Sequence, residues 1–126
     1  MKTNNLKLIE SSYYLSLLAL FILYLFPGSL IGYFLYGNSG QQPNLIKNPI
    51  GNSINHFFYF SYLTFLAAIC NPGKKSFFLN FFFIFSISIL LEVLHFVIPN
   101  RAFQYYDLLA NISGVMIVVI IKKIFI

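Results

Sequence analysis

The sequence predicts an all-α membrane protein, a single domain over residues 1–126 that forms a four-transmembrane-helix bundle with both termini in the cytoplasm. The first observation behind this prediction is composition: 59% of the 126 residues are hydrophobic and only 9% are charged. Soluble domains carry about 25% charged residues, so a water-soluble fold has no means of burying this much apolar surface. The other two observations are the lengths of the apolar segments and the placement of the basic residues.

Four apolar segments are expected to form the helices, over about residues 13–36, 54–70, 77–98 and 106–121. A helix that crosses the membrane needs about 20 residues, so the second and fourth segments must recruit flanking residues. Pro27-Gly28 interrupts the first segment and leaves two alternatives open. Either one helix bends at the proline, or the helix ends near Phe26 and residues 28–36 lie along the membrane interface.

Polar linkers separate the segments. Residues 37–53 are rich in Gly, Asn and Pro and are typical of a loop, while residues 71–76 ("NPGKKS") predict a tight turn. Residues 99–106 join the third and fourth segments. The sequence shows no internal repeat.

The basic residues predict the orientation, because cytoplasmic loops carry an excess of Lys and Arg. With four spans, the two termini and the second loop lie on one side of the membrane. The basic residues on that side are Lys2, Lys7, Lys74, Lys75, Lys122 and Lys123. The opposite side carries Lys47 and Arg101. This asymmetry favours cytoplasmic termini, and the dispersed charges form no stripe that would indicate a nucleic-acid partner.

Most of the polar groups that are costly to place in a membrane lie near the predicted outer surface. Their spacing puts them on single helix faces. The three faces are Ser88, Glu92 and His95; Asp107, Asn111 and Gly114; and His56 with Tyr59. A charge at the bilayer centre costs at least about 2.5–3.5 kcal/mol, so such groups are expected to turn inward and pair. We therefore predict one outward-open polar pocket among the second, third and fourth helices.

The same residues resemble the VanZ-like family of small bacterial integral membrane proteins. The matching segments are "NHFFYFSYL" (55–63) and "EVLHFVIPNRAFQYYDLLANISG" (92–114). The matched family positions are His56, Phe57, Tyr59, Phe60, Glu92, Pro99, Arg101, Asp107, Asn111 and Gly114. The sequence departs from the family pattern at His95, where the family has Gln, and at Asn52-Ser53, where it has Asp-Lys.

The resemblance implies a bacterial inner membrane and a role beside cell-envelope or polysaccharide pathways. The family is named for a protein linked to glycopeptide (teicoplanin) resistance, so the resemblance supplies a fold and a compartment rather than a reaction. The first hypothesis is an accessory protein that recognises a membrane lipid or a lipid-linked envelope precursor, with an envelope-biosynthesis protein as a further partner. Its ligand-binding residues would be His56, Tyr59, Arg101, Asp107 and Asn111.

Two other functions stay open. A membrane-embedded hydrolase or transferase would use Glu92 or His95 as its general base, which makes these two the candidate catalytic residues. A small proton-coupled transporter is the third hypothesis, although transporters favour sites near the midplane and internal repeats.

Each candidate residue also has a structural interpretation. Glu92 can pair with Arg101 or accept a hydrogen bond from His95, and Asp107 can serve as an acid at a helix N-terminus. Glu-x-x-His occurs once, whereas bundle metal sites repeat it, although His56 and Asp107 could complete a set of four ligands. We predict no metal, because both histidines more simply extend to lipid headgroups or bond to neighbouring side chains. We also predict no cofactor, and the sequence lacks a P-loop, a dinucleotide fingerprint and HExxH.

Overall fold

The structure, a computed structural model, describes residues 3–41 and 51–125, apart from the side chains of residues 51 and 52. Within these residues it is all-α. Its five helices are α1 (Asn4–Leu25), α2 (Leu30–Tyr36), α3 (Gly51–Cys70), α4 (Lys74–Leu94) and α5 (Tyr105–Phe125). Four of them, α1, α3, α4 and α5, are long and apolar enough to cross a membrane. The all-α class is confirmed, and the helices indicate a multi-pass membrane protein.

The first predicted helix, over residues 13–36, is wrong at both ends. Helix α1 starts at Asn4 and stops at Leu25. It stops because a proline disfavours the helical conformation of the residue before it, and Phe26 accordingly has an extended backbone (φ −67°, ψ 132°). Of the two alternatives at Pro27, the structure therefore has the one in which the helix ends.

Helix α2 is a short helix of seven residues that follows the end of α1. The hydroxyl of Ser29 caps its N-terminus by accepting from the Gly32 N–H at 3.0 Å. Gly37 ends it in the left-handed conformation (φ 67°), which a glycine adopts without steric cost. The Ser29 N–H then donates to the Ser39 carbonyl at 2.7 Å, so the chain returns to the start of the helix.

The other three predicted helices are found with shifted ends. Each recruits flanking residues: α3 begins at Gly51, α4 at Lys74, and α5 extends to Phe125. The predicted tight turn is present between Cys70 and Lys74. The third helix ends at Leu94 rather than residue 98, and Asn100 in the following loop has a positive φ of 59°.

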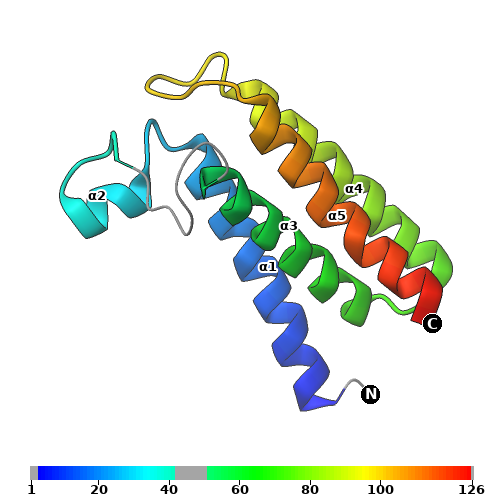
Figure 1. Cartoon of the computed structure of the whole chain (residues 1–126). Helices are drawn as coiled ribbons and strands as arrows, with labels where there is room; N and C mark the ends of the chain where they lie inside the picture. The colour runs from blue at the N-terminus through cyan, green and yellow to red at the C-terminus, as the bar shows by residue number, and fades with distance from the viewer. Residues whose placement is uncertain (1–2, 42–50, 126) are drawn as a thin grey trace.

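Both chain ends lie at one end of the bundle, and α2 and the α4–α5 loop lie at the other (Figure 1). Helices α3, α4 and α5 run side by side, with α5 packed chiefly on α3, and α1 packs mainly on α3. Of the basic residues, Arg101 is at the α2 end, whereas Lys7, Lys74, Lys75, Lys122 and Lys123 are on helices at the end that carries the termini. Lys2 and Lys47 lie outside the described residues.

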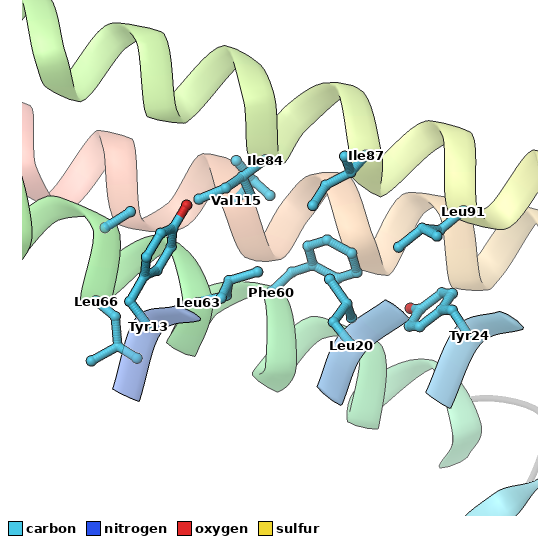
Figure 2. Close-up of a cluster of buried hydrophobic side chains, with 11 residues drawn as sticks. Tyr13, Leu20, Tyr24, Phe60, Leu63, Leu66, Ile84, Ile87, Leu91 and Val115 are labelled. Atoms are coloured by element: carbon cyan, nitrogen blue, oxygen red, sulfur yellow. The ribbon is translucent and has the colours of Figure 1, made fainter. Parts of the chain in front are cut away.

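An apolar core joins the four long helices along their length (Figure 2). Leu20 from α1, Phe60 and Leu63 from α3 and Ile84 from α4 are fully buried there. Outside the core, large apolar side chains are exposed, among them Phe34 at 76%. An apolar exterior around a packed core is the pattern of a protein whose surroundings are lipid.

Candidate functional site: a buried polar cluster at one end of the bundle

The four long helices bring polar side chains together at the end of the bundle that carries α2. Two come from α4 and its C-cap, two from the first turns of α5, and one each from the last turn of α1 and the start of α3. We call these residues the polar cluster: Tyr24, His56, Glu92, His95, Asp107 and Asn111. The predicted convergence of the second, third and fourth helices is thus present, and α1 joins them.

The predicted face of α4 is buried against its neighbours. Ser88 and Glu92 are fully buried, and His95 is 3% exposed at the C-cap. Glu92 Oε1 accepts from the Gln104 backbone N–H at 3.1 Å and lies 3.3 Å from His95 Nδ1. Glu92 therefore ties the end of α4 to the segment that leads into α5. Of its two structural interpretations, the contact with His95 is present.

His95 is held on both ring nitrogens. Nε2 lies 3.1 Å from the carbonyl oxygen of Tyr24, while Nδ1 faces Glu92. The ring also stacks on the Tyr24 ring, with centroids 5.4 Å apart and planes at 17°. Because a carbonyl only accepts, Nε2 must carry a proton and donate it. This geometry makes His95 a link between α4 and α1.

Asp107 lies in the first turn of α5, as predicted for an acid at a helix N-terminus. It is also buried. Its Oδ1 accepts from the Ser53 hydroxyl at 2.7 Å, and its Oδ2 lies 3.7 Å from His56 Nε2. Ser53 is therefore the hydrogen-bond donor to this carboxylate.

His56, Tyr24 and Asn111 form a closed triangle of polar groups. The Tyr24 hydroxyl donates to Asn111 Oδ1 at 2.8 Å and also contacts His56 Nδ1, which lies 3.2 Å from the same amide oxygen. Asn111 Nδ2 donates to the Ser88 carbonyl at 3.0 Å, which fixes the direction of the amide. The triangle thereby fixes the plane of the His56 ring, with Nε2 toward Asp107.

Arg101 stabilises the end of α1. Its Nε donates to the Phe26 carbonyl at 3.1 Å, and Nη2 donates to the Leu23 carbonyl. These carbonyls have no partner within a helix that ends at Leu25. Burial lowers the pKa of the guanidinium from its ordinary value, and the nearby Glu92 and Asp107 act in the opposite direction.

An ion pair of Arg101 with a carboxylate was one of the alternatives that the sequence left open. Among the residues that the structure describes, Glu92 and Asp107 form their ion-pair contacts with histidines instead. The reason is geometric: the fork of Arg101 is taken up by the two carbonyls at the end of α1.

A cavity of about 120 Å³ lies beside the polar cluster. Its polar lining is Tyr24, Ser29, Asn55, His56, Tyr59 and Arg101, and its apolar lining comes from α1 and α2. A single water needs about 10–15 Å³ of such space, so the cavity has room for a small polar group. Tyr59 is also anchored, since its hydroxyl donates to the Ser16 carbonyl at 2.6 Å.

The cavity differs from the predicted pocket in its walls. It lies between α1, α2, α3 and Arg101, not among α3, α4 and α5. Among the predicted site residues, His56, Tyr59 and Arg101 line it, whereas Glu92, His95, Asp107 and Asn111 are buried behind it. The cause is the close packing of α3 on α5, which fills the space where the pocket was expected.

Three side chains of the polar cluster also come close enough to share an ion. One ring nitrogen of His56 and one carboxylate oxygen each from Glu92 and Asp107 lie within 4.8 Å of one another. His95 is not among them, although Glu-x-x-His was the spacing that raised the question of a metal.

Tyr24 is the residue that the sequence analysis missed. It stands in an apolar run, and helical spacing alone relates it only to residues such as Tyr13 and Leu20 on α1. The one available signal was its hydroxyl, since a buried tyrosine usually needs a hydrogen-bond partner.

No protein-family model, curated protein or solved structure matches the chain.

Proposed function

We propose that this protein is a VanZ-like accessory protein of a bacterial inner membrane that binds the anionic headgroup of a membrane lipid or a lipid-linked envelope precursor. The observation that carries the proposal is the cavity between α1, α2 and α3, which combines a guanidinium with polar and apolar walls. Arginine suits phosphate and carboxylate groups because its planar fork donates several parallel hydrogen bonds.

The lining supports a division of roles. Two Arg101 donor nitrogens, Nε and Nη2, are used by α1, and Arg101 also lines the cavity, so in this proposal Nη1 serves the ligand. His56 and Tyr59 contribute polar atoms on the wall that α3 forms. Asp107 and Asn111 act indirectly, since they contact His56. The apolar residues of α1 and α2 suit an acyl or prenyl chain next to the headgroup.

Filling the cavity tests this proposal. Ile31→Trp should exclude the ligand. Ile31 lines the cavity, and the larger indole side chain of the variant would occupy much of it. Native mass spectrometry of the protein purified with bacterial lipids is the measurement. The wild type should retain one defined anionic lipid, and Ile31→Trp should lose most of it.

Phe34→Trp is the matched control on the same helix. Phe34 is 76% exposed and is not part of the cavity lining, so the lipid should be retained. Equal retention in both variants would contradict the proposal, as would a wild type that carries only bulk lipid in bulk proportions.

The proposed orientation, with cytoplasmic termini and a cavity that opens outward, has its own test. The chain has one cysteine, so a Cys70→Ser background can receive single new cysteines. A membrane-impermeant maleimide should label Ala102→Cys in intact cells and Ser76→Cys only after permeabilisation. The reverse labelling pattern would mean that the termini lie outside and that the cavity opens toward the cytoplasm. Positive residues on the end that carries the termini support the proposed direction.

A second candidate function rests on one contact. His56 lines the cavity, and in this candidate its Nε2 carries the proton and donates it toward the Asp107 carboxylate, so that Nδ1, beside the Tyr24 hydroxyl, is the general base. A hydrolase or transferase of lipid headgroups would therefore use His56 rather than Glu92 or His95, which do not line the cavity. Turnover of a headgroup that is abolished in His56→Gln, while the lipid is still retained through Arg101, would favour this candidate.

A further inference from the structure

We propose that His56, Glu92 and Asp107 bind a divalent transition-metal ion in the polar cluster. The site goes beyond the proposed function, because lipid binding in the cavity does not require it. It rests on three features of the cluster: the spacing of the donor atoms, the orientation of His56 and an unsatisfied buried oxygen on Glu92.

The donor atoms are nearly at the spacing of a metal site. His56 Nε2 and Asp107 Oδ2 are 3.7 Å apart, and all three donors lie within 4.8 Å of one another. Ligand atoms around a tetrahedral ion with bonds of about 2.1 Å lie roughly 3.4 Å apart. Small side-chain rotations on three different helices therefore suffice to close the site.

The triangle around His56 prepares its other nitrogen to bind metal. Asn111 Oδ1 only accepts, and it lies 3.2 Å from Nδ1. Since Asn111 Nδ2 is already directed at the Ser88 carbonyl, Nδ1 satisfies the triangle best as an N–H donor. Nε2 then presents a lone pair toward Asp107. A hydrogen bond from one ring nitrogen to an oxygen, with the other nitrogen facing carboxylates, is how proteins orient a metal-binding histidine.

Glu92 supplies the independent sign of a ligand. The side chain is fully buried, and Oε2 has no hydrogen-bond partner, while Oε1 faces the Gln104 N–H and His95. A buried carboxylate oxygen without a partner costs free energy. A proton on His56 would satisfy Asp107 but would leave Glu92 Oε2 as it is. A cation bound by all three residues would give Glu92 a charged partner that it lacks among the described residues.

The donor set indicates the kind of ion. Imidazole nitrogen with two carboxylate oxygens suits a first-row transition metal such as Zn²⁺ or Mn²⁺. Calcium takes six to eight oxygen ligands, and three protein donors with a nitrogen among them do not supply this set. An entry path exists, because His56 lines the cavity.

The test measures metal directly in the purified wild type, treated first with EDTA and then with Zn²⁺ or Mn²⁺. Elemental analysis by mass spectrometry should find one ion per chain, and the ion should raise the melting temperature. Glu92→Gln and Asp107→Asn should each weaken binding by more than about 100-fold. Loss of outer hydrogen bonds alone costs about 10–100-fold, which is the range expected for Tyr24→Phe.

Glu10→Gln is the matched control. The chain has only three acidic residues, two of them in the site and the third, Glu10, near the N-terminal end of α1. Metal binding by the Glu10→Gln variant should equal that of the wild type. Each variant is compared only when it is monodisperse and keeps its helical circular dichroism, and Tyr24→Phe provides a second variant if a carboxyl variant fails to fold.

Two results would overturn the site. One is a wild type that takes up less than stoichiometric metal and shows no thermal shift with either ion. The other is metal uptake that Glu92→Gln and Asp107→Asn leave unchanged. Because the readout is metal content, loss of the lipid in Ile31→Trp leaves this result unaffected, so the two proposals fail separately.

Discussion

Gly114→Leu is expected to lower the free energy of unfolding by at least about 3 kcal/mol, the upper end of the usual cost of overpacking. A Cβ atom at position 114 would lie 2.5 Å from the Phe57 carbonyl oxygen and 3.1 Å from the Ser61 nitrogen. Both are backbone atoms of α3, so no side-chain rotation relieves the clash. Helices α3 and α5 must separate, and Asp107 and Asn111 then move away from His56.

Thermal unfolding in detergent, followed by circular dichroism, measures this effect. Ser113→Leu is the control, because it adds a large side chain at the neighbouring position, which is exposed. Its melting temperature should stay close to that of the wild type, and Gly114→Ala should fall between the two. If Gly114→Leu had the same melting temperature as Ser113→Leu, α3 and α5 would not be in close contact at Gly114.

Arg101→Ala should cost about 2–3 kcal/mol and loosen the end of α1. The variant removes two hydrogen bonds from a charged donor, each worth about 1.5–3 kcal/mol, and partial exposure of the side chain reduces the total. It leaves the carbonyls of Leu23 and Phe26 without their donor. Thermal unfolding measures the cost, and limited proteolysis should cut faster between α1 and α3.

Arg101→Lys should recover only part of the lost stability, because an ammonium group lacks the planar fork that reaches two carbonyls. Gln104→Ala is the control in the same segment, since its side chain is exposed and its backbone N–H still donates to Glu92. Full stability in Arg101→Ala would show that the guanidinium does not stabilise α1.

The sequence was sufficient for the number of long apolar helices and for two of the polar faces, but not for the ends of the first helix. Hydrophobic length predicted four spans, and the spacing of Ser88, Glu92 and His95 predicted a face that is buried in the structure. The end of the first helix was left open at Pro27, because a proline in a membrane helix either bends or ends it and tertiary contacts decide which. The structure has hydrogen bonds from Arg101 and His95 to carbonyls at the end of α1.

The position of the cavity could not be predicted from periodicity. Helical spacing says which residues share a face, but it does not say how closely two faces approach. Gly114 lets α5 come so near α3 that an added Cβ atom would meet the α3 backbone, so the two faces are closely packed. The partner of Arg101 was missed for a related reason: backbone carbonyls at a helix end compete with carboxylates for a guanidinium, and a sequence pattern does not display them.

The hydrogen bonds at the C-terminal end of α1 have a consequence for the biosynthesis of the chain. The carbonyls of Leu23, Tyr24 and Phe26 accept hydrogen bonds from donors that lie 71 to 78 residues later in the chain. During translation α1 leaves the ribosome well before His95 and Arg101 are synthesised. It must therefore enter the bilayer before these hydrogen bonds can form. A nascent chain stopped before His95 would therefore carry α1, α3 and α4 but none of the donors that hold the end of α1.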